Sequence, residues 1–171
     1  MHHVEGDQFP IGELDGCERA RTRDIAGLLV NAGFRSRILD DIRSEIWLKA
    51  WGALSINPIS ALTRATMAEI CTDPGTRALV ASMMREAQGI AEALGVTFRH
   101  TIEKRIEGAR LVGQHKTSML QDLERGEELE LDALLGSVIE IGNILGLQTP
   151  SMSAVYACAA LLDKGARLAN A

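Results

Sequence analysis

Residues 46–62 are the stretch that most constrains the fold of this chain, because they are almost entirely uncharged. The run reads Ile-Trp-Leu-Lys-Ala-Trp-Gly-Ala-Leu-Ser-Ile-Asn-Pro-Ile-Ser-Ala-Leu, and Lys49 is its one ionisable side chain. A helix that is apolar around most of its circumference is usually buried. Because lysine is almost never fully buried without a partner, we expect Lys49 either to extend its charge to the surface or to be held in a cleft.

The spacing of Lys49, Ala53 and Asn57 places these three residues on one face of a helix, each one turn from the next. Asn57 precedes Pro58, and the residue before a proline is disfavoured in helical conformation. We therefore expect the regular helix to be interrupted there, with a second helical segment running to about Arg64. Taken alone, this stretch favours the simpler interpretation, a core helix with a lysine that reaches the surface.

The composition favours a helical protein. Apolar residues make up 46% of the 171 residues and aromatic residues only 4%, and the apolar types present suit helices better than strands. The net charge of −5, without a long run of one sign, argues against nucleic acid or an anionic membrane as a partner. The three cysteines are scattered singly, which matches neither a metal site nor a disulfide framework. No run reaches transmembrane length and no signal peptide is visible, so we expect a cytoplasmic protein.

Capping residues and apolar spacing predict an all-α fold, a multi-helix bundle built around residues 46–62. Asp40 or Asp41 is expected to cap the central helix, and Ser118 to cap a short later one. Glycines are expected to end helices, and the pairs Asp-Pro at 73–74 and Thr-Pro at 149–150 to begin them. The helix over 97–111 is expected to carry its basic residues on its outer face. The central helix is expected to run from its cap at Asp40 or Asp41 through residues 46–57. The other expected helical segments cover residues 19–31, 58–64, 66–70, 74–94, 97–111, 118–126, 133–145 and 150–168, with an extended connection over 34–39.

The first sixteen residues are expected to be extended, because turn residues surround a short apolar alternation there. We therefore divide the chain into a segment over 1–16 and a helical domain over 17–171. A strand this short is not stable by itself. It is expected to lie on the helical domain or to pair with another copy of the chain, and a frayed terminus is the alternative.

A second stretch, residues 115–132, changes the interpretation of the first. It contains the run Ser-Met-Leu-Gln-Asp at 118–122 and ends in Glu-Leu-Asp at 130–132. Together with Trp47, Lys49 and the run Asn-Pro-Ile-Ser-Ala-Leu at 57–62, it resembles the C-terminal domain of the ketopantoate reductase (2-dehydropantoate 2-reductase) family. Two separated segments that match in order form a more specific signal than one short motif.

The resemblance implies a fold related to the helical domain of 6-phosphogluconate dehydrogenase. It implies an oxidoreductase that reduces the keto group of ketopantoate to pantoate with NADPH, in pantothenate and coenzyme A biosynthesis. Residues 1–16 would then be the remnant of the last strand of a missing nucleotide-binding domain. No G-x-G-x-x-G motif lies between a strand and a helix in this chain, so we expect no cofactor-binding residues and no activity from this domain alone. The expected partners are a 2-oxo acid and the missing domain; a homodimer is left open, and no metal is expected.

The resemblance also implies site residues. Lys49 matches the general acid, and Glu130 the glutamate that holds the substrate and helps orient the lysine. Ser118 matches the serine that binds the substrate carboxylate, and Asn57 an asparagine that contacts the substrate. Each of these residues also has a purely structural interpretation. Lys49 could pair with the acid at 41 or 45, and Glu130 could be one solvated carboxylate in an acidic run. Ser118 could be a plain helix cap, and the Asn57 amide could bond to backbone groups left without partners by Pro58.

Ala53 departs from the family pattern, which usually has asparagine four residues after the lysine. Alanine supplies no hydrogen bond to a substrate hydroxyl or to the lysine. Three interpretations therefore stay open for the sequence. The chain is a ketopantoate reductase domain, a domain of a related reductase that acts on another 2-oxo acid, or a non-catalytic helical oligomerisation module.

Overall fold

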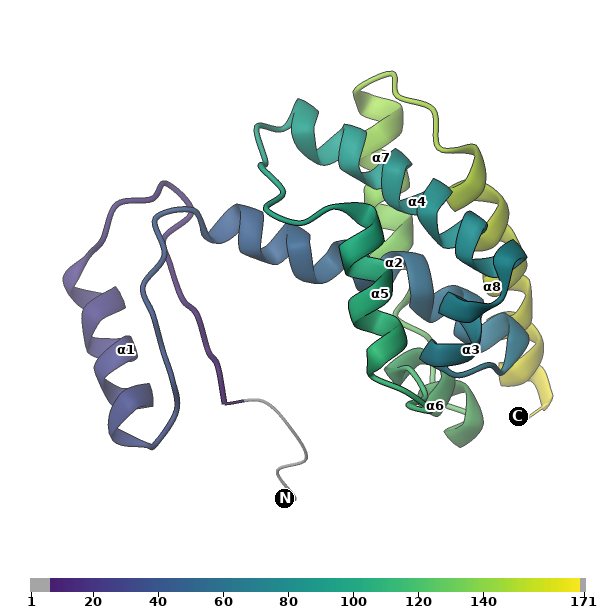
Figure 1. Cartoon of the computed structure of the whole chain (residues 1–171), viewed down its shortest axis with the longest axis horizontal. Helices are drawn as coiled ribbons and strands as arrows, with labels where there is room; N and C mark the ends of the chain where they lie inside the picture. The colour runs from purple at the N-terminus through teal and green to yellow at the C-terminus, as the bar shows by residue number, and fades with distance from the viewer. Residues whose placement is uncertain (1–6, 170–171) are drawn as a thin grey trace. The chain divides into compact units, whose positions relative to one another are not determined.

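The computed structural model describes residues 7–169, which form eight α-helices and one π-helix (Figure 1). The predicted all-α class is confirmed. Residues 1–6 of the predicted extended segment lie outside the described part. The chain divides into two compact units, one ending at Trp47 and one beginning at Leu48. This division falls inside a helix and lies further along the chain than the boundary after residue 16 that the sequence suggested.

The first unit consists of one helix between two extended segments. The extended segments on either side of α1 (Ala20–Asn31) pair in parallel through the bridges Gln8↔Arg35 and Ile11↔Ile38. A parallel pair needs a crossover connection, and α1 provides it. The sequence predicted α1 and the extended segment over 34–39, but it did not predict that this segment pairs with residues 8–11.

The central helix, α2 (Ile42–Thr63), runs without interruption through Pro58, so the predicted break at the Asn-Pro step is wrong. Pro58 is fully buried, and packing in the second unit therefore holds a helix that has lost one backbone hydrogen bond. The carboxylate of Asp41 caps the start by accepting from the Ser44 N–H at 3.0 Å. The helix ends before Arg64, which adopts a left-handed φ of 59°.

Trp51 anchors the core of the second unit, as expected of a buried central helix. Its fully buried indole N–H donates to the Met84 carbonyl oxygen at 2.7 Å, and its ring centroid lies 4.4 Å from that of Phe98. Helix α4 (Pro74–Ala93) also packs against α3 (Met67–Thr72), α5 (Ile102–Leu111), α7 (Ser137–Ile144) and α8 (Pro150–Ala169). Fully buried side chains fill the space between them: Leu54, Val80, Met83, Ile90, Ile106, Leu120, Leu135 and Met152.

Some helix starts follow the sequence prediction and others do not. Asp73 caps α4 and Pro74 occupies its first position, as predicted. Helix α6 (Ser118–Arg125) is capped by Thr117, whose side chain accepts from the Leu120 N–H, so the prediction of Ser118 as the cap is wrong by one residue. Helix α5 begins at Ile102, later than the predicted start at 97.

The segment before α7 forms a π-helix, η1 (Asp132–Gly136), where the start of an α-helix over 133–145 was predicted. Asp132 accepts a hydrogen bond from the Tyr156 hydroxyl on α8. None of the helices within residues 7–169 combines the length and the apolar character that a bilayer-spanning segment needs.

Candidate functional site

A pocket of about 310 Å³ opens between helices α2 and α5 of the second unit. Helix α2 contributes Lys49, Ala53 and Asn57 to its lining, the three residues that their spacing placed on one face of the helix. Small residues leave the space open and two cations lie in its wall. The full lining is Lys49, Gly52, Ala53, Ile56, Asn57, Met67, Arg105, Gly108, Ala109 and Val112.

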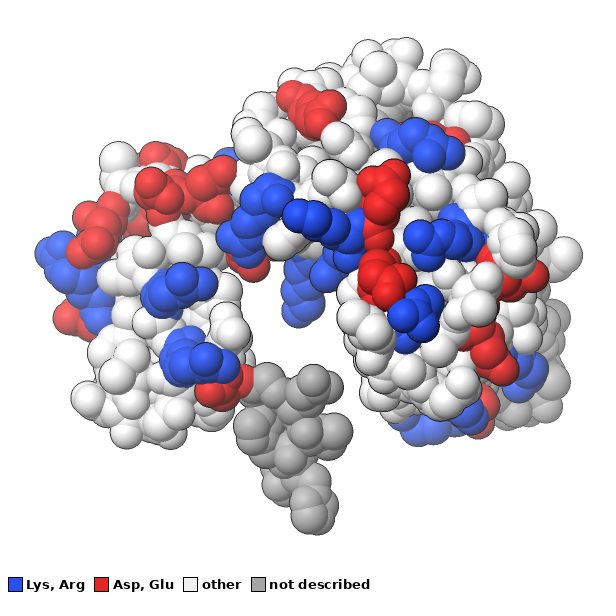
Figure 2. Space-filling model, in the orientation of Figure 1, with Lys and Arg blue, Asp and Glu red and all other residues white. Residues whose placement is uncertain are grey.

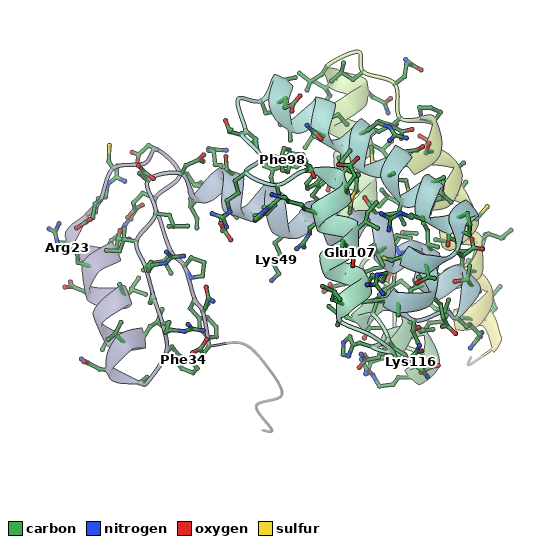
Figure 3. The ribbon with its side chains drawn as sticks, viewed as in Figure 1. Arg23, Phe34, Lys49, Phe98, Glu107 and Lys116 are labelled. Carbon is green, nitrogen blue, oxygen red and sulfur yellow. The ribbon has the colours of Figure 1, made fainter. Side chains whose placement is uncertain are left out.

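Lys49 is exposed and extends from α2 beside α5 (Figure 3). Within the second unit, no carboxylate pairs with its ammonium and no hydrogen bond is formed to it. Asp41, one of the acids considered as its partner, instead caps α2. On the face shown in Figure 2, Lys and Arg side chains gather over α2. The lysine therefore offers its charge to whatever enters the pocket.

Arg105 is the site residue that the sequence did not reveal. It was expected on the outer, basic face of its helix, but its half-buried guanidinium lines the pocket and lies against Gly52. A Cβ atom at Gly52 would come within 2.6 Å of one terminal nitrogen of Arg105. Burial lowers the pKa of this guanidinium, the direction expected for a cation that is drawn away from water. The one indication in the sequence was Gly52, a glycine among bulky residues of the central helix. A glycine at that position does not show which side chain packs against it.

Ser118 and Glu130 are not among the residues that line this pocket. Ser118 is the exposed first residue of α6, and the loop before it docks at the pocket edge, because the N–H of the lining residue Met67 donates to the His115 carbonyl oxygen at 3.0 Å. Glu130 is exposed between buried Leu129 and Leu131, so its side chain points out from the core. The structure therefore brings together two of the four predicted site residues, Lys49 and Asn57.

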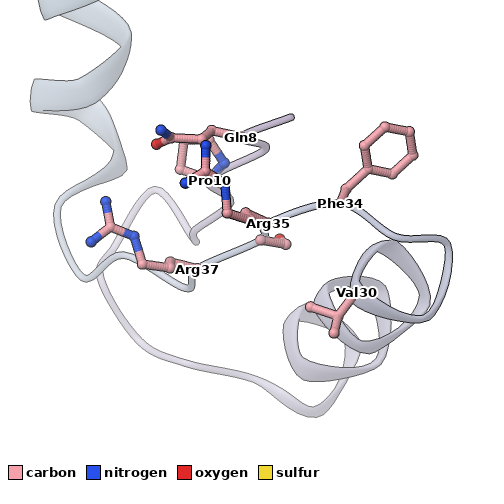
Figure 4. A pocket seen from close by; sticks show the side chains of 7 residues that line it. Gln8, Pro10, Val30, Phe34, Arg35 and Arg37 are labelled. Atoms are coloured by element: carbon pink, nitrogen blue, oxygen red, sulfur yellow. The ribbon is translucent and has the colours of Figure 1, made fainter. Parts of the chain in front are cut away.

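A larger hollow of about 570 Å³ lies in the first unit (Figure 4). Its charged lining residues are Arg35, which pairs with Asp7, and Arg37. Neither is suited to donate a proton at neutral pH, because arginine stays charged in proteins. No group of His, Cys, Asp and Glu side chains within residues 7–169 is placed to hold a metal ion. A third hollow, beside the Tyr156–Asp132 contact, contains no lysine or arginine. The Lys49 pocket is therefore the candidate site.

The described residues do not fit the phosphates of a dinucleotide at the turn where a β-α-β unit usually holds them. The turn before α1 carries Glu13 and Asp15, and these carboxylates pair with Arg19 and Arg21. Two acids at that position repel an anion and occupy the local arginines. A nicotinamide cofactor would therefore need a binding site that these residues do not supply.

Comparison with known proteins identifies the family of this chain. The family model for "Ketopantoate reductase PanE/ApbA C terminal" matches residues 41–163. A 2-dehydropantoate 2-reductase of Mesorhizobium japonicum is 53% identical over 157 residues, which cover 92% of this chain and 48% of that protein. The chain thus spans about half the length of this curated relative.

Solved structures give the same result. The crystal structure of a putative ketopantoate reductase from Ralstonia solanacearum superimposes with a TM-score of 0.90 at 35% identity, over 95% of this chain and 50% of that one. A dimeric ketopantoate reductase from Staphylococcus aureus gives a TM-score of 0.79 at 25% identity, over 96% of this chain and 56% of that one. The chain belongs to the ketopantoate reductase family, and it corresponds to the C-terminal domain of that family.

Proposed function

We propose that this chain is the substrate-binding and proton-donating half of an NADPH-dependent, cytoplasmic 2-oxo acid reductase. One observation carries the proposal. The helix that matches the family motif presents Lys49 and Asn57 to a pocket of about 310 Å³, a size suited to a small acid. The first unit does not fit a dinucleotide, so the chain by itself is expected to be inactive and not to bind NADPH.

Reduction of a 2-oxo acid adds a hydride to the carbonyl carbon and a proton to the carbonyl oxygen. A bound dihydronicotinamide supplies the hydride. Lys49 donates the proton, and its ammonium stabilises the negative charge that develops on the oxygen. The lysine is left neutral and regains its proton from water. The Asn57 side chain, which lines the same pocket, hydrogen-bonds the substrate and helps to fix its orientation.

Ser118 and Glu130 complete the proposed site from the α6 side. The docking of the 113–117 loop beside Met67 supports an approach of Ser118 to the pocket edge. For Glu130, support comes from its match to the family segment. We therefore assign Lys49 and Asn57 as substrate-binding residues inside the pocket. We assign Ser118 and Glu130 as residues that contact the substrate at the rim of the pocket.

Ala53 favours a second candidate, a reductase of the same type that prefers a 2-oxo acid other than ketopantoate. Ala53 lines the pocket beside Lys49, where the family usually carries an amide. A site built to hydrogen-bond a substrate hydroxyl discriminates strongly through that contact. Without an amide at position 53, the pocket lacks one hydrogen bond that would favour ketopantoate through its hydroxyl group. By its likeness to the dimeric family member, we also propose that the two-domain protein forms a homodimer.

A chimera tests the function. The half of the Mesorhizobium japonicum protein that this chain does not match can be joined to the chain and assayed with NADPH and a panel of 2-oxo acids that includes ketopantoate. We expect acid-dependent oxidation of NADPH, and a fall in kcat of about 10²- to 10⁴-fold in Lys49→Met. Lys116→Met is the matched control, because Lys116 pairs with Glu124 and does not line the pocket. A folded chimera that binds NADPH but reduces none of the acids would overturn the proposal.

A further inference from the structure

Arg105 is a half-buried cation without an anion. Neither an ion pair nor a hydrogen bond to its side chain is formed within the second unit. The acids on its own helix are engaged elsewhere: Glu107 pairs with Arg110 at 2.7 Å, and hydrogen bonds at the helix start, including one with Thr101, lower the pKa of Glu103. A guanidinium that loses water without gaining an acid is unfavourable, and a bound anion would offset that cost.

The local sequence is arranged to hold this guanidinium in the pocket. Gly52, buried in the middle of α2, is the surface on which it lies, since a Cβ there would approach its Nε to 2.8 Å and its central carbon to 3.1 Å. Gly108 and Ala109 on α5 and Ala53 on α2 add little bulk to the same wall. The guanidinium thus lines the open space of the pocket beside several small residues.

We propose that Arg105 anchors the substrate carboxylate from within the pocket, in addition to the contact proposed for Ser118 at the rim, and that the pocket takes a small 2-oxo acid through two cations, Arg105 on the carboxylate and Lys49 on the keto oxygen. The carboxylate and the keto group of such an acid lie on adjacent carbons, so one pocket lined by both cations serves both groups. Arginine suits the role because its planar fork of donors matches the two oxygens of a carboxylate. The proposal rests on the proposed function and adds a substrate-binding residue to that same site.

A phosphate is the competing anion, because a guanidinium also pairs with phosphate oxygens. Two features favour the carboxylate. The volume of about 310 Å³ accommodates a small molecule, and Lys49, the proposed proton donor, lines the same wall. A phosphate at Arg105 would occupy the space that the proposed function requires for the substrate.

The test uses the 171-residue chain and NMR spectroscopy, with no enzymatic activity as readout. The side-chain Nε–H signal of Arg105 and the amide signals of Gly52 and Gly108 are followed during titration with ketopantoate, with its uncharged lactone, with inorganic phosphate and with NADP. We expect saturable shifts with ketopantoate and no saturable shift with the lactone. Arg105→Met should weaken acid binding by about 10-fold or more, with Arg105→Lys in between. Lys104→Met, an exposed charge on the same helix, is the matched control and should bind as the wild type does.

Three results would each overturn the inference. They are the absence of a saturable shift at millimolar ketopantoate, equal shifts with the acid and the lactone, and tighter binding of phosphate or NADP at Arg105. The wild-type titration needs no variant, so a folding defect in Arg105→Met leaves the test intact. The chimera distinguishes a failure of the proposed function from a failure of this inference. If the chimera is inactive but the chain binds the acid through Arg105, only the proposed function is refuted. An active chimera whose KM for the acid is unchanged by Arg105→Met refutes the anchor alone.

Discussion

Gly52→Ala separates the stability of α2 from the placement of Arg105. Glycine within a helix costs about 1 kcal/mol relative to alanine, so the substitution should favour the helix by that amount. The new methyl group, however, would lie 2.6 Å from a terminal nitrogen of Arg105 and must displace the guanidinium. That group is the far end of a flexible side chain, so it can move at modest cost, but it leaves the position from which it would hold a carboxylate.

We expect the free energy of unfolding of the variant to lie within about 1 kcal/mol of the wild-type value. We expect its affinity for the acid to be about 10-fold lower, which corresponds to a loss of about 1.4 kcal/mol of binding free energy. Urea unfolding measures the first quantity, and titration followed by NMR measures the second. Gly89→Ala on α4 is the matched control: a Cβ there meets nothing within 4 Å, and Gly89 does not line the pocket. It should gain stability and keep its affinity. If Gly52→Ala binds the acid as well as Gly89→Ala does, the guanidinium is not the anchor and the reasoning is wrong.

Three further predictions concern other parts of the chain. Ala53→Asn in the chimera should raise kcat/KM for ketopantoate by the equivalent of about 1–3 kcal/mol, because the amide restores a buried hydrogen-bond partner; steady-state kinetics showing no gain would mean that the asparagine is dispensable. Hydrogen bonds from Arg21 and Thr22 lower the pKa of Glu13 from its usual 4.5 to about 2. Glu13→Gln should therefore melt at a lower temperature than the wild type above pH 4.5, and this difference should vanish as the pH falls towards 2; a difference that persists at the lowest pH would contradict this. Trp51→Phe should destabilise the second unit by about 2–4 kcal/mol in urea unfolding, because it leaves a cavity and removes the buried hydrogen bond from the indole to the Met84 carbonyl oxygen; a loss well below 1 kcal/mol would show that the core closes around the smaller ring.

Local signals in the sequence predicted most of the helices. Each needs only a short window of residues, as with Asp73 and Pro74 at the start of α4, and the structure confirms that start. The same local rule failed at Pro58, because burial in the second unit outweighs the preference of the preceding residue. It also chose the wrong one of two neighbouring hydroxyls, Thr117 and Ser118, which are equivalent by residue type.

Features that depend on residues far apart in the chain were not predicted. The π-helix at 132–136 accompanies a contact between Asp132 and Tyr156 on α8. The inward position of Arg105 depends on Gly52, which lies on another helix. In the candidate site, the periodicity of α2 predicted the shared face of Lys49 and Asn57, whereas no periodicity within one helix could reveal what lies across from it.

The contact between Gly52 and Arg105 makes these two positions dependent on each other during evolution. While the arginine is present, alanine at 52 is penalised in function although it favours the helix. Once the arginine is lost, alanine at 52 becomes acceptable and adds about 1 kcal/mol of helix propensity. A later return of arginine at 105 would then meet a methyl group where the guanidinium lay. Loss of the anchor is therefore difficult to reverse by a single substitution.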